Sequence, residues 1–290
     1  MIAKILFTLI LTFISAAAWA EPLSVLVSIT PQLWLANQIG GELINTRVLL
    51  DKGQDPHGMQ PTPEQVTALF RSRIYFTVGL EFEHELERKI NQPDTGVQVV
   101  DTSAEIKKIS MTQHKHGHYE QGEAQHGGLD PHVWLDPQNL RQMAAAMAAA
   151  LKKADPANAA VYERNLQNTD KTLTELHTKI KQQLAPFSGQ SFLVFHPAFG
   201  YFAHAYSLHQ EAVEVEGKSP LPRQLHALIV KAKQEKIKVI FVQPQFDRKN
   251  AETIAQAIGG TVVSLDPMAV DVPGNLRYMA EQISAALAPK

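Results

Sequence analysis

Short runs rich in β-branched residues alternate with amphipathic helical patterns along most of the chain, and this alternation restricts the fold to one broad class. Strands separated by helices are typical of parallel sheets with right-handed crossovers. The sequence therefore predicts an α/β fold of two lobes, each a parallel sheet built from about four βα units. The expected strands are 23–29, 44–50, 73–79, 97–100, 191–195, 212–215, 238–242 and 261–265.

One long amphipathic helix is expected at 156–184, between the two halves. Its apolar residues recur at spacings that keep them on one face. At about 1.5 Å per residue it would be roughly 40 Å long, enough to run along both lobes as a rigid strut. We therefore expect lobes at 21–154 and 186–290, joined by a linker helix at 155–185. The apolar positions are Tyr162, Leu166, Leu173, Leu176, Ile180 and Leu184.

The first twenty residues have the pattern of a secretory signal peptide. Lys4 precedes an apolar run at 5–14 that is too short to span a bilayer, and Ala18-Trp19-Ala20 is a small-x-small cleavage site. The 290-residue sequence contains no cysteine, which excludes disulfides, thiolate metal sites and a thiol-linked lipid anchor. A formal net charge of -2 argues against nucleic-acid binding. We expect 1–20 to be removed and the protein to be soluble in the periplasm.

Three histidines and one aspartate follow predicted strands, where open α/β sheets bind ligands. His57 follows the second strand, His132 the fourth, His196 the fifth and Asp266 the eighth. Each of His57 and His132 comes after an Asp-Pro step, which favours extended backbone, so we expect His132 in a rigid, nearly extended turn. Taken singly, each position is as well explained by a structural turn. All four can converge if the lobes face each other, which predicts a metal site in the cleft.

Three imidazoles and a carboxylate without sulfur suit zinc in a tetrahedral site. If all four residues bind, no coordination position is left for a reactive water, and the chain lacks a His-Glu-x-x-His pattern. We therefore expect metal binding without catalysis: no catalytic residues, no resident cofactor, and Zn²⁺ as the bound ligand.

Several motifs together resemble the periplasmic metal-binding proteins of ABC importers, and specifically their zinc-uptake branch. The resemblance covers nearly the whole chain beyond residue 20. It implies metal held between two α/β lobes, ligand roles for His57, His132, His196 and Asp266, and delivery of zinc to a membrane permease. In the manganese and iron branches of the family that this chain resembles, a carboxylate stands at the position of His196. The motifs are Asp55-Pro56-His57, the run 130–137, the run 196–202, the run 216–220 and Leu265-Asp266-Pro267.

A polar segment at 102–128 interrupts the strand–helix rhythm and is expected to be a mobile surface loop. The zinc branch often carries a longer His- and acid-rich loop at this place. We expect its histidines to form weak secondary zinc sites and not the main site. They are His114, His116, His118 and His126.

The remaining histidines have structural explanations. His84, His177 and His226 lie on predicted helices, and His204 and His209 follow the fifth strand without a matching partner. Asp271 is a substitute for Asp266 if the turn is shifted.

Three alternatives stay open. One is a manganese or iron carrier of the same architecture, and another is a haem or metal-chelate binder, which would need a wide cleft lined by aromatic or basic residues. The third is a periplasmic zinc hydrolase with Asp266 or Glu216 as base. We expect a monomer whose partners are the zinc ion and the permease.

Overall fold

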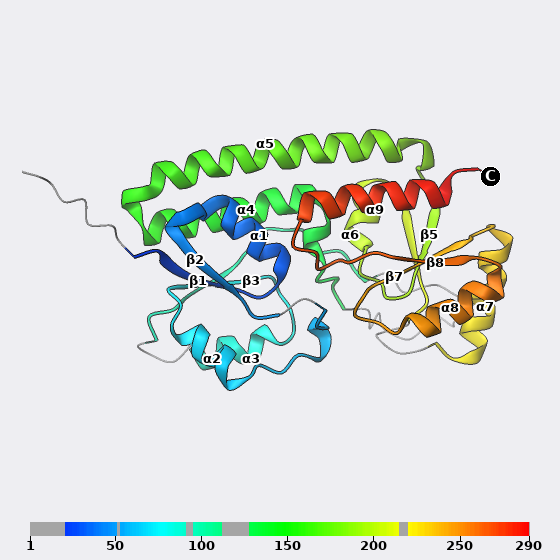
Figure 1. Ribbon diagram of the computed structural model, residues 1–290, viewed down its shortest axis with the longest axis horizontal. Coiled ribbons are helices and arrows are strands. Elements are labelled where there is room, and N and C mark those ends of the chain that lie inside the picture. The colour runs from blue at the N-terminus through cyan, green and yellow to red at the C-terminus, as the bar shows by residue number, and fades with distance from the viewer. Residues whose placement is uncertain (1–20, 51–52, 91–94, 112–127, 215–219, 290) are drawn as a thin grey trace, which may run out of the picture.

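The protein folds into two α/β lobes that lie side by side, with one long helix running along both (Figure 1). The computed structural model describes residues 21–50, 53–90, 95–111, 128–214 and 220–289. The predicted fold class is confirmed.

Each lobe is built on a four-stranded, fully parallel sheet, and the two sheets have the same strand order. The first sheet runs β2-β1-β3-β4 and the second β6-β5-β7-β8. In both, the chain passes first to one side of the opening strand and then to the other, so each sheet has a point where the connections diverge. Ligands bind beyond the carboxyl ends of strands at such points. The strands are β1 Leu23–Val27, β2 Ile44–Val48, β3 Ile74–Thr77, β4 Gln98–Asp101, β5 Ser191–Val194, β6 His209–Ala212, β7 Val239–Val242 and β8 Thr261–Ser264.

Helices cover both faces of each sheet. In the first lobe, α1 and α4 lie on the side of the long helix α5, and α2 and α3 lie on the opposite side (Figure 1). In the second lobe, α9 packs against α5, and α7 and α8 lie together farther from it. The helices are α1 Thr30–Gly40, α2 Pro63–Phe70, α3 Glu83–Ile90, α4 Pro137–Ala154, α5 Ala159–Leu184, α6 Gly200–Ala205, α7 Pro222–Gln234, α8 Arg248–Ile258 and α9 Val272–Leu287.

Side-chain caps fix where several helices begin. The sequence Thr62-Pro63-Glu64-Gln65 predicts a capping box at the start of α2. The structure confirms it, since Thr62 accepts the amide of Gln65 and the Gln65 side chain accepts the amide of Thr62. Asp136 caps α4 ahead of Pro137. Asp271 is exposed and caps α9 through Gly274, so its carboxylate is used by the helix end.

One apolar core continues from the first lobe into the second. It joins buried residues of β1, α4 and α5 to residues of α6 and α9. A second, smaller core fills the space between the second sheet and helices α7 and α8. The packing between the lobes is therefore as continuous as the packing within one lobe.

Three local expectations were wrong. The sixth strand is His209–Ala212 and not 212–215, because Ser191 to Val194 of β5 pair with this earlier stretch. The segment after β4 is not loose at its start, since Thr102, Ser103 and Ile106 are buried. His132 is not extended: with ψ of 43° it begins the 3-10 turn η3 Val133–Leu135.

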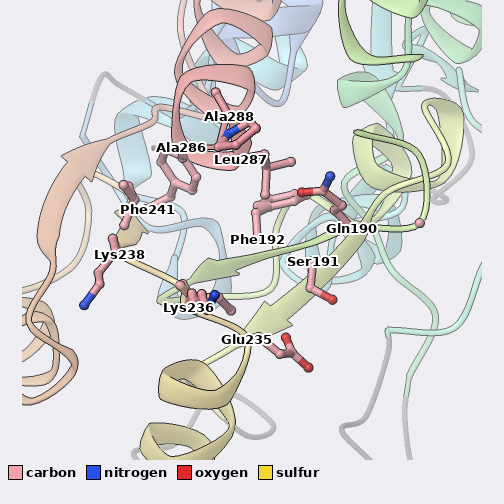
Figure 2. Close-up of a pocket in the computed structure, with 14 residues that line it drawn as sticks. Gln190, Ser191, Phe192, Glu235, Lys236, Lys238, Phe241, Ala286, Leu287 and Ala288 are labelled. Carbon is pink, nitrogen blue, oxygen red and sulfur yellow. The ribbon is translucent and has the colours of Figure 1, made fainter. Parts of the chain in front are cut away.

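Among the residues that the structure describes, no helix is both long and apolar enough to cross a membrane. A cavity of about 640 Å³ lies at the amino-terminal edge of the second sheet, at the opposite edge from the carboxyl ends of its strands. Figure 2 shows Phe192, Phe241 and Leu287 gathered in it, with the Lys238 side chain pointing outward. It contains no histidine, and it is separate from the candidate metal centre.

Candidate metal centre

His132 is held by the aspartate two residues before it. The Asp130 carboxylate accepts hydrogen bonds from the His132 backbone amide at 2.9 Å and from Nδ1 at 2.8 Å. Both residues are almost completely buried. Because an ionised carboxylate only accepts, Nδ1 is the protonated nitrogen and Nε2 carries the lone pair that a metal needs.

His196 is oriented in the same way from the second lobe. Its Nδ1 lies 2.8 Å from Oε2 of Glu214, which follows β6. The Gln243 side chain accepts the His196 amide and donates to its carbonyl, which fixes the backbone after β5. Phe246 stacks on the imidazole with ring centroids 4.8 Å apart.

The two imidazoles face each other across the lobe boundary. Their ring centroids are 5.6 Å apart and their planes are nearly perpendicular. A cavity of about 20 Å³ lies between them, which is room for one water-sized sphere. The structure thus brings together two of the four predicted ligands around a space of the size of a single ion.

His57 lies in the 3-10 turn η2 Pro56–Gly58, and its side chain is outside the described part of the structure. Its neighbours Asp55 and Pro56 line the cavity beside His132 and His196. The backbone that carries His57 therefore reaches the same place.

Asp266 follows β8 as predicted and is half-buried, but Gln245, Pro267 and Met268 line the cavity and Asp266 does not. Its Oδ1 accepts from the Met268 amide at 2.9 Å and from Gln245 Nε2 at 3.2 Å. Asp266 as a ligand stays a prediction. Among the described side chains, which exclude that of His57, no three histidines, aspartates or glutamates are grouped as a metal site.

Contacts across the lobe boundary hold the two histidines at this spacing. Trp134 Nε1 donates to the Pro267 carbonyl at 2.7 Å, and Thr30 donates to the Met268 carbonyl. Tyr201 donates to the Asp130 carbonyl at 3.2 Å. The turns that carry His132 and Asp266 are thereby fastened to each other.

The other histidines lie elsewhere. His84 and His226 are exposed, and His177 packs near Tyr206, where burial lowers its pKa. His204 and His209 line a separate surface cavity of about 530 Å³. The secondary-site histidines His114, His116, His118 and His126, and the alternative base Glu216, lie outside the described residues.

A buried carboxylate is found beyond the ends of β1 and β3 in the first lobe. Glu83 accepts the amides of Val78, Gly79 and Leu80 at 2.7 to 3.1 Å. Desolvation raises its pKa from 4.5 to about 7, against the effect of these donors. Lys108, close by, has its pKa lowered by burial.

Sequence reasoning missed the residues that orient the site. Asp130 was noticed only for its Asp-Pro step, and Glu214, Gln243 and Gln245 were not singled out at all. A carboxylate two residues before a candidate ligand histidine was a usable signal for Asp130. The sequence held no such signal for Glu214, since its partner His196 is eighteen residues away, in the connection after the neighbouring strand.

Comparison with known proteins agrees with this geometry. The family model of the periplasmic zinc-uptake complex component A, ZnuA, matches residues 25–286. The high-affinity zinc uptake system protein ZnuA of Paracoccus denitrificans is 30% identical over 270 residues, covering 80% of each chain. The manganese ABC transporter substrate-binding lipoprotein PsaA of Streptococcus pneumoniae is 27% identical, covering 77% of this chain and 72% of its own.

A crystal structure of a ZnuA deletion mutant with zinc bound is 34% identical and superposes with a TM-score of 0.84, covering 93% of this chain and all of the other. Fold and site thus define an extracytoplasmic solute-binding protein of two α/β lobes. The chain belongs to the ZnuA family, and the resemblance read from its motifs is confirmed.

Proposed function

We propose that this protein captures zinc in the periplasm and delivers it to the permease of an ABC importer. The observation that carries the proposal is the pair His132 and His196, one from each lobe, each with Nδ1 on a buried carboxylate and both bordering an ion-sized cavity. Carboxylate–histidine pairs of this kind orient imidazoles toward zinc.

In this proposal His57, His132 and His196 hold the ion, and the fourth donor is an oxygen at the Asp266 side of the cavity. Imidazole nitrogens favour zinc over manganese, which prefers oxygen ligands. The zinc-binding relatives support the same choice, whereas the manganese relative keeps the manganese alternative open to test. A cavity of about 20 Å³ is too small for haem or a metal chelate.

The proposal includes binding without catalysis, because a zinc hydrolase needs an open coordination position for water. It also includes a monomer that interacts with the permease and not with nucleic acid. Residues 1–20 are proposed to be a signal peptide that is removed on export, and the absence of cysteine from the sequence argues against a lipid anchor.

The decisive experiment combines metal analysis with competition titration. Protein purified from periplasm should contain one zinc per chain, and its mature N-terminus by mass spectrometry should be Glu21. Alanine variants of His57, His132 and His196 should each bind zinc much more weakly, with His226→Ala, an exposed histidine on α7, as the matched control. Tight binding of manganese in preference to zinc, or wild-type affinity in the His132 and His196 variants, would reject the proposal.

The secondary sites need a separate test. Main-chain bonds between Met111 and Gly128 and between Ile109 and Asp130 hold the two ends of the histidine-rich segment together. A short Gly-Ser linker can therefore replace 114–126 without pulling on His132. Isothermal titration should then show one tight zinc retained and weaker additional binding lost. Loss of the tight site would place a main ligand in the segment.

A further inference from the structure

We propose that Gln245 supplies the fourth, oxygen donor to the zinc ion and that Asp266 acts as the residue that positions it, an inference that rests on the proposed function. Gln245 lies after β7 and lines the cavity together with His132 and His196. Asp266, which the sequence pattern suggests as a ligand, is absent from that lining.

The orientation of the Gln245 amide follows from its partner. The hydrogen bond joins one end of the amide to Asp266 Oδ1 at 3.2 Å, and a carboxylate oxygen accepts hydrogen bonds. The end that faces Asp266 must therefore be Nε2, which leaves Oε1 at the other end. The amide cannot be turned over without setting two oxygens against each other.

The remaining oxygen is buried and has no hydrogen-bond donor among the described residues. A buried acceptor without a partner loses its bonds to water and gains none in return, so such a group calls for a ligand. The cavity has room for one water-sized sphere, so an ion between the imidazoles would leave no space for an intervening water. Oε1 would contact the ion itself.

The same arrangement then occurs three times around the cavity. A carboxylate orients three of the four proposed neutral donors: Asp130 orients His132, Glu214 orients His196, and Asp266 orients Gln245. Asp266 is itself fixed, since its Oδ1 also accepts the Met268 amide and its carbonyl accepts from Asn275. The donors themselves are neutral, and the carboxylates lie behind them.

Zinc affinity of four variants separates this inference from direct coordination by Asp266. Gln245→Met keeps the shape but removes the oxygen, and it should weaken zinc binding about 10- to 100-fold. Asp266→Ala should weaken it by a similar factor, whereas Asp266→Asn should bind within about threefold of wild type because its amide oxygen still accepts from Gln245. In the double variant Gln245→Met with Asp266→Ala, the two losses should not add. Gln256→Met, on the exposed face of α8, is the matched control.

Cobalt-substituted protein adds a readout of the coordination shell. The visible absorption bands of bound Co²⁺ should change in Gln245→Met and stay unchanged in Asp266→Asn and Gln256→Met. Denaturant unfolding of each metal-free variant separates loss of the fold from loss of the ligand.

Two outcomes would overturn the inference. One is wild-type affinity and an unchanged cobalt spectrum in Gln245→Met. The other is a further tenfold loss when Asp266→Ala is added to Gln245→Met, which would make Asp266 a ligand. In either case tight zinc binding by the wild type, lost in His132→Ala, would leave the proposed function standing.

Discussion

Single buried carboxylates decide much of the chemistry of this protein. Asp130 and Glu214 each accept an Nδ1–H, so the same imidazole nitrogen, Nε2, is offered from both lobes. Glu83 instead accepts backbone amides and shapes the loop after β3. The first two lie at the candidate metal centre, and the third is buried in the first lobe.

Removing the carboxylate behind His196 should weaken the site without removing a ligand. Glu214→Ala leaves Nδ1 without its acceptor and lets the ring turn, so zinc affinity should fall about 10- to 100-fold. Glu214→Gln keeps an acceptor oxygen and should lose less. Competition titration measures both. Glu252→Ala, which removes an exposed carboxylate on α8, should bind like wild type; equal affinity in Glu214→Ala and this control would show that the pair does not orient His196.

Glu83 should make the first lobe more stable as pH falls toward 5. Its pKa in the folded protein, about 7, lies above the ordinary 4.5, so the folded state takes up a proton that the unfolded state does not. The free energy of unfolding should therefore rise, by up to roughly 3 kcal/mol, as pH falls from above 7 toward 4.5.

Denaturant unfolding of the metal-free protein between pH 5 and 8 measures this effect. Glu83→Gln should remove that part of the pH dependence, and Glu81→Gln, an exposed neighbour, should keep it. Identical pH profiles for wild type and Glu83→Gln would mean that the carboxylate stays charged on its three amide donors.

At the scale of helices and turns, close approach of α6 to the turn before His132 joins the lobes. A Cβ on Gly200, where α6 begins, would overlap Asp130 Oδ2, so any larger residue there must displace that carboxylate. Tyr201, the next residue, donates to the Asp130 carbonyl. The start of α6, which follows His196, therefore packs directly against Asp130, the residue that orients His132.

Gly200→Ala should disturb both stability and metal binding. The added methyl must displace the buried Asp130 carboxylate, at a cost of about 1–3 kcal/mol in the free energy of unfolding. Zinc affinity should fall with it, because Asp130 would no longer hold His132. Denaturant unfolding and competition titration are the measurements. Gly128→Ala, with open space around its Cβ, is the control; an unaffected Gly200→Ala would show that the contact can relax freely.

The elements themselves could be predicted from sequence, but two local features could not. The apolar spacing and flanking residues at 222–234 and 248–258 are local signals, and the helices that they predict have the same bounds as α7 and α8. The edge strand β6 was predicted too late in the sequence, because His209, Gln210 and Glu211 do not form an apolar run. Only their pairing with β5 makes these residues a strand. The backbone of His132 turns because the Asp130 side chain folds back on it, which Asp-Pro statistics do not include.

The convergence of His132 and His196 at the candidate metal centre could be predicted, but the residues that support them could not. Strand ends brought His132 and His196 together as expected, because parallel sheets align their carboxyl edges. The roles of Glu214 and Gln245 depend on side-chain directions across neighbouring connections, which a single sequence does not contain. Whether Asp266 binds the ion stays a prediction for the same reason.

At the scale of the whole molecule, the site is closed by contacts between lobes. Trp134, in the turn η3 ahead of α4, donates across the boundary to the Pro267 carbonyl. Its ring also lies 5.3 Å from that of His132. One side chain thus contacts His132 of the candidate metal centre and also fixes the position of one lobe relative to the other.

Trp134→Phe should make the relative position of the two lobes less fixed. The Pro267 carbonyl would lose its donor, and zinc affinity should fall by about tenfold, equal to about 1.4 kcal/mol. The zinc-induced rise in thermal midpoint should shrink in parallel, because stabilisation by a ligand follows its affinity. Titration and thermal scans with and without zinc measure both. Trp34→Phe, partly buried in α1, should change neither; an equal effect of the two substitutions would point to general loosening.

The apolar core that runs unbroken from one lobe to the other has a kinetic consequence. A wide opening of the cleft would expose that core to water and bend the 26-residue helix α5, so the lobes have no low-energy hinge by which to swing apart. Uptake should then need no slow closure after encounter, and its rate should follow diffusion of the ion and loss of its hydration shell. Release is the opposite case, because the ion leaves only as its ligands detach one at a time. A transporter that receives the ion must then accelerate that step by displacing a turn at the edge of the site, and not by separating the two lobes.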